Sequence, residues 1–335
     1  MRLFAGRTAD EAWSGAAAAF VIEGGGREQA SRAGATREVL NAAFTIRDPL
    51  ERWVLARRPA INPAFAIVET VWILAGRDDS ALLNHWNPEL PKYTGPGDRY
   101  HGAYGHRLRH RFGLDQLERT YLALSKNPDS RQVVLQIWDS RTDLPDEEGR
   151  SASPDIPCNV LSMLKVRDGK LEWTQVMRSN DLFRGVPYNF VQFTVLQEVI
   201  AGWLGLEVGS YDHLSGSLHV YEDDFGSLEG FDRQAEIVPN TDSVRLPKEQ
   251  SDEAFAALEK RLDAMTSDSL TEERMRELSE DTGLPGAFEN LLRVAAADSA
   301  RRRGWIGLSQ AIVGGCTNGA LLQIWEGWLS RMGSP

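Results

Sequence analysis

One cysteine stands where a nucleophile could work. Cys158 follows a proline in the segment 155–159 and comes directly before the apolar run 160–166, which is typical of a strand. A thiol reacts as its thiolate, and nearby guanidinium groups lower its pKa. A polar segment that begins with Arg178 follows the next predicted strand. Composition alone leaves a second role open, in which Cys158 is a small buried apolar residue.

A carboxylate in an apolar segment is the second candidate for chemistry. The segment 64–75 is apolar except at Glu69 and Thr70, and this composition predicts a buried helix. Burial raises the pKa of a carboxyl group, and a raised pKa suits a group that exchanges protons near neutral pH. A structural hydrogen bond inside the core is the alternative role for Glu69.

These residues must be positioned by a sheet and by helices packed against it. Three segments have the composition of strands: 132–138, 160–166 and 171–177. A hairpin turn is predicted between the last two. Helical spacing of apolar residues predicts three helices in this part of the chain: 10–22, 64–75 and 188–204. We therefore expect an α+β fold with a mixed sheet packed against helices.

The last part of the chain differs in composition. After Asp224 the sequence changes, and from about Pro247 it is charged, with leucines at helical spacing. We place a boundary near residue 235, which separates a catalytic domain over 1–235 from a helical C-terminal extension over 236–335. Cofactor cover, dimer contact and simple packing are all open as roles for the extension.

Composition and charge limit the class of protein. Of the 335 residues, 42% are hydrophobic and 25% are charged, which is typical of a soluble globular protein. The net charge of −11 argues against a broad nucleic-acid surface, so no DNA partner is expected. No apolar run reaches the roughly 18–20 residues that cross a bilayer, and no separate signal core is present. We predict cytoplasmic residence, no membrane partner and no disulfide between the two cysteines.

Several segments resemble thymidylate synthases and their relatives, the pyrimidine-nucleotide hydroxymethylases. The matching segments occur in the family's order and near its spacing: 31–34, 69–76, 102–105, 130–131, 158, 178–189 and 217–221. Together they span roughly residues 5–225, about two-thirds of the chain. The resemblance implies the family's fold, with the mixed sheet as its centre.

The resemblance also implies a reaction. Cys158 aligns with the nucleophile that adds to C6 of a pyrimidine nucleoside monophosphate, which makes C5 electron-rich enough to attack the methylene of 5,10-methylenetetrahydrofolate. Glu69 aligns with the general acid/base that works through ordered water, and Tyr104 with the tyrosine near the C5 proton. Asn159 stands where most thymidylate synthases have histidine, and we group it with the catalytic residues. No metal is expected.

The remaining site residues implied by the resemblance form a nucleotide set and a folate set. The nucleotide set is Arg32, Arg131 and Arg178 for the phosphate, Ser179 beside them, Asn189 for the base, and His219 and Tyr221 for the sugar hydroxyl. Alternation along a strand puts the last two on one face. The folate set is Asp181 for the pterin, Leu90 and Gly185.

The sequence departs from the family at several of these positions. Gln132 replaces the second of two paired arginines, and Ser217 replaces an aspartate. Leu90 replaces the tryptophan that shields the methylene intermediate, Tyr93 replaces a second tryptophan, and the usual closing C-terminal segment is not found. A site that excludes water less completely favours addition of water over hydride delivery. We therefore predict hydroxymethylation of CMP, dCMP or dUMP, with reductive methylation of dUMP to dTMP as the alternative.

The sequence leaves alternatives open for the base and sugar of the nucleotide and for the oligomeric state of the protein. Asn189 favours uracil, but Asn159 is a second amide near the base edge, and amides can turn over to suit cytosine. The resemblance implies a homodimer formed by sheet-to-sheet packing, in which Arg131 reaches the partner's site. A non-catalytic nucleotide-binding homologue is a further alternative, supported by Gln132 and Ser217. A cysteine hydrolase is disfavoured, because none of the histidines beyond the matched motifs lies in a recognisable partner motif for Cys158.

Overall fold

A mixed sheet forms the centre of the protein in the computed structural model, which describes residues 1–335 except 23–24, 32–33, 233–235, 281 and 331–335. The strand order is β1-β3-β8-β6-β5-β4, with β2 paired to β3 and β7 paired to β8. The strands are β1 Arg2–Gly6, β2 Arg27–Ser31, β3 Gly34–Ile46, β4 Val134–Gln136, β5 Asn159–Arg167, β6 Lys170–Met177, β7 Asn180–Asp181 and β8 Glu207–Tyr221. Parallel and antiparallel pairs both occur, so the predicted α+β fold with a mixed sheet is confirmed.

The predicted hairpin is present, whereas the predicted strand 132–138 is regular only in part. β5 and β6 are joined at Asp168 and Gly169, which both have positive φ (50° and 73°) and so form the predicted tight hairpin turn. The predicted strand 132–138 is regular only over β4. The backbone N–H groups of Ile137 and Trp138 both donate to the same carbonyl oxygen, that of Val160, and the regular ladder ends there.

Three predicted helices are present and are capped as their sequences suggest. α1 (Ala9–Val21) begins after Thr8, whose hydroxyl accepts from the backbone N–H of Glu11. α2 (Pro63–Leu74) begins with proline, and the side chain of Asn62 caps it by accepting from the backbone N–H of Phe65. α8 (Val186–Leu204) ends at Gly205 in the left-handed conformation and packs against β6 and β8.

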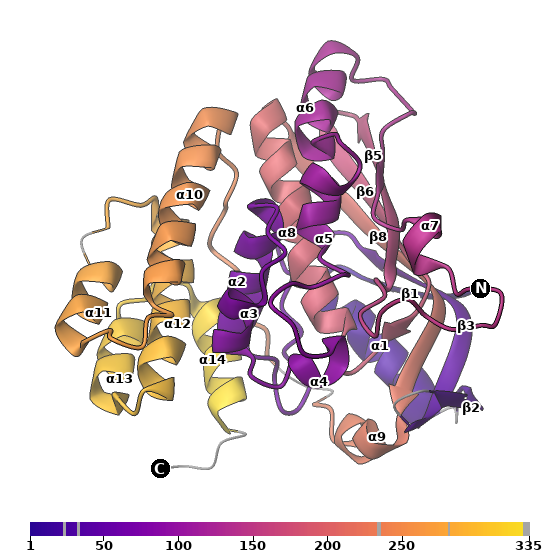
Figure 1. Cartoon of the computed structure of the whole chain (residues 1–335), viewed down its shortest axis with the longest axis horizontal. Helices are drawn as coiled ribbons and strands as arrows, with labels where there is room; N and C mark the ends of the chain where they lie inside the picture. Colours follow the sequence, from indigo (N-terminus) through magenta and orange to yellow (C-terminus); the bar gives the residue numbers. More distant parts are fainter. Residues whose placement is uncertain (23–24, 32–33, 233–235, 281, 331–335) are drawn as a thin grey trace.

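Shorter helices connect these elements. They are α3 Ser80–Trp86, α4 Pro91–Thr94, α5 Tyr104–His106, the π-helical turn η1 Arg107–Arg111, α6 Gln116–Lys126, α7 Ser140–Asp143 and α9 Glu222–Glu229. α2, α5, α6 and α8 lie on one side of the strands β5, β6 and β8 (Figure 1). Along β8, alternate residues up to Ser215 are buried toward these helices, and the intervening residues are only half-buried.

A kink in two neighbouring strands changes which residues face outward. The pairing of β3 with β8 skips Asn41, which has φ 54°, and Gly216. The partners on both sides of this skipped pair stay in one register, but the alternation of buried residues along β8 shifts by one residue there. Buried positions are therefore odd up to Ser215 and even afterwards, so His219 and Tyr221 lie on the half-exposed face.

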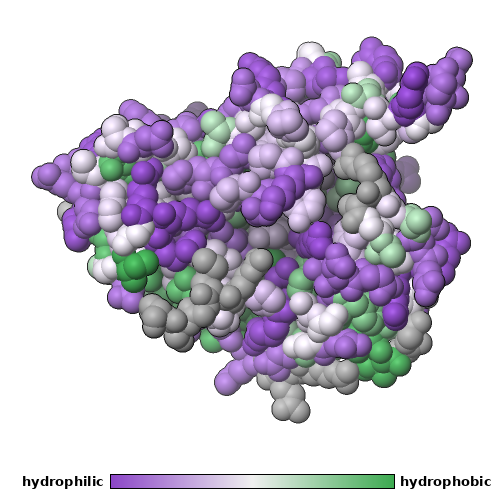
Figure 2. Space-filling model, turned by 60° about the horizontal axis from the view of Figure 1, so that its bottom comes forward, coloured by the Kyte–Doolittle hydropathy of each residue, from purple (hydrophilic) through white to green (hydrophobic). Residues whose placement is uncertain are grey.

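The C-terminal helices form a group beside the sheet layer (Figure 1). They are α10 Lys248–Ala264, α11 Glu272–Ser279, α12 Gly286–Arg302, α13 Ile306–Gly314 and α14 Gly319–Leu329. The extension shares one continuous hydrophobic core with the rest of the described chain and packs on α2, α3 and α8. In the view of Figure 2 the surface is mostly hydrophilic, with apolar residues in small separate groups. Within the described part of the chain, no helix is both long and apolar enough to span a bilayer.

Candidate active site

The thiol of Cys158 lies beside a guanidinium group. Cys158 is half-buried immediately before β5, and Arg178 follows β6, the neighbouring strand. Nη2 of Arg178 lies 3.8 Å from Sγ of Cys158, and the same guanidinium donates to the carbonyl oxygens of Pro157 (2.9 Å) and Ile156 (3.1 Å). These backbone bonds hold the cation in place. A guanidinium so placed stabilises the thiolate form of a cysteine.

Glu69 reaches the same region through a relay of amides. α2 carries Glu69, and α8 carries Gln192 and Asn189. Nε2 of Gln192 donates to Oε2 of Glu69 (2.6 Å), and Nδ2 of Asn189 donates to Oε1 of Gln192 (3.0 Å). Burial raises the pKa of Glu69 to about 7, although the bond from Gln192 opposes this shift. Glu69 is thus able to exchange a proton near neutral pH, as its apolar segment predicts.

Tyr104 completes the group of titratable side chains. Burial is the main cause that raises the pKa of Tyr104 well above 10, and the negative charges of Cys158 and Glu69 add to it. The phenol therefore stays protonated and can donate a hydrogen bond. Gly105 lets its helix approach α2 closely, because an added Cβ would lie 2.3 Å from the carbonyl oxygen of Ile73.

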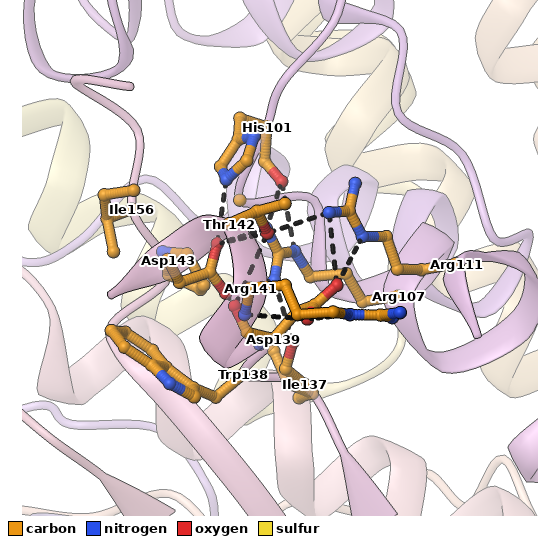
Figure 3. A network of polar contacts seen from close by, with 12 residues as sticks. His101, Arg107, Arg111, Ile137, Trp138, Asp139, Arg141, Thr142, Asp143 and Ile156 are labelled. Carbon is orange, nitrogen blue, oxygen red and sulfur yellow. Dashed lines mark hydrogen bonds and ion pairs between the residues drawn. The ribbon is translucent and has the colours of Figure 1, made fainter. Parts of the chain in front are cut away.

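A buried ionic network supports the wall behind the thiol. The carboxylate of Asp143 accepts from the guanidinium of Arg107 (2.6 and 2.9 Å) and lies 2.8 Å from Nε2 of His101. Burial opposes ionisation, but these bonds bring the pKa of Asp143 to about 2. Trp138 and Ile156 lie beside the network (Figure 3). The positions of Arg107 and Asp143 carry no sequence signal that separates them from surface charges.

The predicted sugar-binding residues lie together at the end of β8. The rings of His219 and Tyr221 meet edge to face at 5.5 Å, and Oγ of Ser179 lies 3.4 Å from Nδ1 of His219. Burial lowers the pKa of His219, so the ring is neutral at pH 7 even though the nearby carboxylates of Asp181 and Glu38 oppose this shift. The imidazole, the phenol and the serine hydroxyl thus place three hydrogen-bonding groups together at the end of β8.

A carboxylate that sequence reasoning missed stands opposite His219. Glu38 pairs with His219 across β3 and β8, and Oγ of Ser217 donates to Oε1 of Glu38 (2.6 Å). This hydrogen bond is the largest cause that holds the pKa of Glu38 below its usual value. A carboxylate from the neighbouring strand thus lies beside Ser217. Strand pairing determines this contact, and no local pattern around Glu38 announces it.

The turn before α8 contains an acceptor without a partner. Oδ1 of Asp181 accepts from the backbone N–H groups of Phe183 (2.7 Å) and Arg184 (2.8 Å), whereas Oδ2 is buried and has no hydrogen-bond partner among the described residues. Burial raises the pKa of Asp181. Gly185 is required nearby, because an added Cβ would lie 2.7 Å from Oδ1 of Asn180. A free carboxylate oxygen of this kind suits the N–H donors of a pterin.

The segment containing Leu90 lies across from this turn. Leu90 is half-buried and directly precedes α4, which carries Tyr93. The hydroxyl of Tyr93 lies 3.4 Å from Nη1 of Arg184, and the guanidinium of Arg184 covers the ring of Tyr221 at 4.8 Å. Arg184 also pairs with Asp224 (2.5 Å). A polar cluster that the sequence did not indicate therefore joins the predicted folate and sugar residues.

The sequence of the chain matches the model of a protein family, described as Thymidylate synthase, over residues 18–260. This chain belongs to the thymidylate synthase family. The match passes the boundary that we predicted near 235 and ends within α10, so the limit of a catalytic domain at that point stays a prediction.

Individual relatives differ in name and in coverage. A deoxyuridylate hydroxymethyltransferase of Bacillus phage SP01 is 36% identical over 202 residues, which is 57% of this chain and 52% of that protein. A protein of the same name from Pseudomonas phage M6 is 37% identical over 177 residues, 52% of this chain and 49% of that protein. The chain thus spans about half the length of the two phage relatives. A putative thymidylate synthase of Methanothermobacter thermautotrophicus (strain Delta H) is 33% identical over 211 residues, 61% of this chain and 87% of that protein.

Three further residues were predicted from the thymidylate synthase resemblance. Arg32 lies outside the described residues. Arg131 is exposed before β4 and makes no hydrogen bond or ion pair with any other described residue. Asn159 is fully buried, its Oδ1 accepts from Nε2 of Gln175, and its Nδ2 has no partner among the described residues. No group of three or more His, Cys, Asp or Glu that could hold a metal occurs in the described part of the chain.

Proposed function

We propose that this chain transfers a one-carbon unit to C5 of deoxyuridylate and forms the 5-hydroxymethyl product. The observation that carries the proposal is the thiol of Cys158 with a guanidinium 3.8 Å away and, in the same region, a carboxyl group whose pKa is about 7. The phage relatives are named for this activity on deoxyuridylate, and this supports uracil and deoxyribose among the substrates left open by the sequence.

The protein side chains divide the chemistry between them. The thiolate of Cys158 adds to C6, and the electron pair of the C5–C6 double bond moves toward C5 and the O4 carbonyl. C5 then forms the bond to the one-carbon unit, and its proton leaves through water to Glu69. Tyr104, kept protonated by burial, donates a hydrogen bond near C5. Loss of the C5 proton would expel the folate amine and leave an exocyclic methylene on the base, to which water adds to give the hydroxymethyl group. The electron pair returned to C5 then expels the thiolate of Cys158 and restores the C5–C6 double bond.

The described residues fit a nucleotide and a folate. Arg178, Ser179, His219 and Tyr221 would hold the phosphate and sugar, with Arg32 and Arg131 as further phosphate ligands, and Asn189 would read the base. 5,10-Methylenetetrahydrofolate would supply the one-carbon unit, with its pterin at the free oxygen of Asp181 beside Gly185 and Leu90. Leu90 covers less surface than an indole, and the Tyr93–Arg184 contact is polar, so water has access to the reacting carbon.

The synthase reaction is the second candidate, because two relatives of which this chain covers 87% and 85% are named putative thymidylate synthases. Incubation with methylenetetrahydrofolate and each of CMP, dCMP, UMP and dUMP separates the two by product mass. We expect a dUMP product heavier by CH2O and no dihydrofolate absorbance. Dihydrofolate together with dTMP would establish the synthase reaction instead.

The nucleophile can be tested without knowledge of the final step. Cys158→Ser should reduce release of tritium from C5-labelled dUMP by about 10³-fold or more, because a hydroxyl adds poorly to C6. Cys316→Ser is the matched control, since Cys316 is buried in the extension against the carbonyl of Asn318 (3.8 Å) and should release tritium at the wild-type rate. Unchanged release by Cys158→Ser would refute the mechanism. No release by the wild type would favour the non-catalytic homologue.

We also propose the homodimer that the resemblance implies. Large apolar side chains are exposed on β1, β3 and β4: Leu3 (62%), Leu40 (46%) and Val134 (50%). Packing of two sheets face to face would cover apolar strand residues and would bring Arg131 to the partner's phosphate site. Cytoplasmic residence and the absence of a DNA partner are further parts of the proposal, the latter supported by the net charge of −11.

A further inference from the structure

The choice of base depends on which end of each amide faces the nucleotide. Uracil presents a donor at N3 and an acceptor at O4, whereas cytosine presents an acceptor at N3 and a donor at the N4 amino group. An asparagine can suit either base, because its oxygen and nitrogen exchange places when the amide turns over. Asn159 and Asn189 are therefore informative only if another group determines their orientation.

Trp173 determines the orientation of Asn159. An indole N–H can only donate, and Nε1 of Trp173 donates to Oε1 of Gln175 (3.0 Å), which also accepts from Oγ of Ser162 (2.7 Å). Nε2 of Gln175 is therefore the opposite end, and it donates to the carbonyl of Leu161 (3.0 Å) and to Oδ1 of Asn159. The end of Asn159 that remains is Nδ2, a donor.

This donor lies in the layer that holds the catalytic side chains. Asn159 is adjacent to Cys158 in the chain, and its side chain is fully buried. The ring of Trp173 packs 6.4 Å from that of Phe193, which in turn lies 6.2 Å from the ring of Tyr104. A buried N–H without a partner is costly, and Nδ2 has none among the described residues, so the site has a place for an acceptor.

Glu69 determines the orientation of Asn189 in the same way. When Glu69 is ionised, its Oε2 can only accept, and it accepts from Nε2 of Gln192 (2.6 Å), so Oε1 of Gln192 is the end that accepts from Nδ2 of Asn189 (3.0 Å). The end of Asn189 that remains is Oδ1, an acceptor, which makes no hydrogen bond with another described residue. The two asparagines thus present one acceptor and one donor.

We propose that these two relays select uracil. Oδ1 of Asn189 accepts from N3–H of the base. Nδ2 of Asn159 donates to O4, either directly or through one water that accepts from Nδ2 and donates to O4. Cytosine would place a lone pair against Oδ1 and an amino group against Nδ2. Gln175, Trp173 and Ser162 are positioning residues for base selection. The inference rests on the proposed function, because it assumes that a pyrimidine lies beside Cys158.

The test is the ratio of dissociation constants for dCMP and dUMP, measured by calorimetry on the full chain without folate. Gln175→Glu keeps the acceptor for Trp173 but cannot donate to Asn159, so the amide of Asn159 turns over and presents oxygen to the base. We expect the dCMP:dUMP ratio to fall by about tenfold or more. Asn159→Asp presents an acceptor without any turnover and should move the ratio in the same direction.

A matched control separates this effect from general damage to the layer. Thr194→Val removes another fully buried polar group from α8. The hydroxyl of Thr194 bonds only within its own helix, to the carbonyls of Phe190 (2.6 Å) and Val191 (3.4 Å), so this variant should leave the ratio unchanged. If Gln175→Glu does not fold, Asn159→Asp decides by the same ratio. An unchanged ratio in the folded variants, or a wild type that binds dCMP more tightly, would overturn the inference. Failure of the proposed function is separate and would show as no one-carbon product from a wild type that binds dUMP selectively.

Discussion

At the scale of single residues, burial sets the chemistry of the site. Glu69 and Tyr104 are far apart in the sequence, yet their pKa values rise for the same main reason, loss of water around them. Cys158 differs, because it is only half-buried and has a cation as neighbour. The site therefore combines a proton carrier that works near neutral pH, a phenol that stays protonated and a thiol beside a positive charge.

Glu69 gives a prediction about pH. The pKa of Glu69 is raised from its ordinary 4.5 to about 7, so the folded protein keeps a proton that the unfolded chain releases in this interval. The stability that this proton contributes is complete below about pH 4.5 and is lost as the pH rises through about 7. Glu69→Gln should therefore be more stable than wild type at pH 8, by about 1–3 kcal/mol in urea unfolding, with little difference at pH 4.

The same group should appear in the kinetics. Acceptance of the C5 proton requires the carboxylate form, so tritium release by the wild type should rise through about pH 7. Glu69→Gln should lose this limb of the profile along with most of the rate. The exposed residue Glu249 offers a control, and Glu249→Gln should keep both the wild-type profile and the wild-type stability. A pH limb near 7 that persisted in Glu69→Gln would assign it to another group.

At the scale of elements, the kink in β3 and β8 and the extension position the site. The skipped pair Asn41 and Gly216 turns His219 and Tyr221 outward while the preceding part of β8 stays packed under α8. The extension supports the helix that carries Glu69. Asp298 of α12 is fully buried and accepts from Nδ2 of Asn62, the cap of α2 (3.3 Å). The extension thus contacts the cap of the helix that carries Glu69.

Asp298 gives a prediction about this support. Its carboxylate also pairs with Arg301 (2.9 Å) and Arg302 (2.8 Å), so Asp298→Ala would leave two partly buried cations without their partner. We expect a loss of about 3–5 kcal/mol in the free energy of unfolding, measured in urea. Glu277→Ala removes an exposed ion pair with Arg274 from the same extension and should cause no measurable change. Equal stability of the two variants would show that α12 does not support α2 through this contact.

At the scale of the whole molecule, the proposed homodimer would bring a second arginine to the proposed phosphate site. Arg178 is held near Cys158 by backbone carbonyls, whereas Arg131 is exposed on the loop before β4. If the sheets of two copies pack face to face, each copy supplies Arg131 to the other. Isologous packing of this kind makes two equivalent shared sites.

Shared sites predict that two inactive variants restore each other. Cys158→Ser and Arg131→Glu should each be inactive alone, but mixed dimers contain one site with an intact thiol and an intact arginine from different copies. Random exchange should restore about a quarter of wild-type tritium release. A mixture of Cys158→Ser with Glu69→Gln is the control and should recover no activity, because both residues belong to the same copy's site and neither crosses the interface. Elution of the wild type as a strict monomer, with no recovery in the first mixture, would exclude the dimer.

The features that the sequence predicted depend on neighbouring residues or on the order of motifs along the chain. Helices α2 and α8 follow from apolar composition and periodicity, and the turn at Asp168 and Gly169 follows from residue types that accept positive φ. The family could be recognised because the motifs keep its order, and the family match over 18–260 confirms it, whereas the roles of the site residues stay a prediction. Even the raised pKa of Glu69 follows from the apolar residues next to it in the chain.

Only the tertiary structure decided the features that depend on residues far apart in the chain. Glu38 supplies the carboxylate near His219 because β3 pairs with β8 in one register, and Arg107 is buried because Asp143 reaches it from another segment. The direction of the amide of Asn159 depends on Trp173 through Gln175, and that of Asn189 depends on Glu69 through Gln192. Hydrogen bonds have donors and acceptors, and their direction passes along a packed network, whereas a sequence pattern records only which side chains are present.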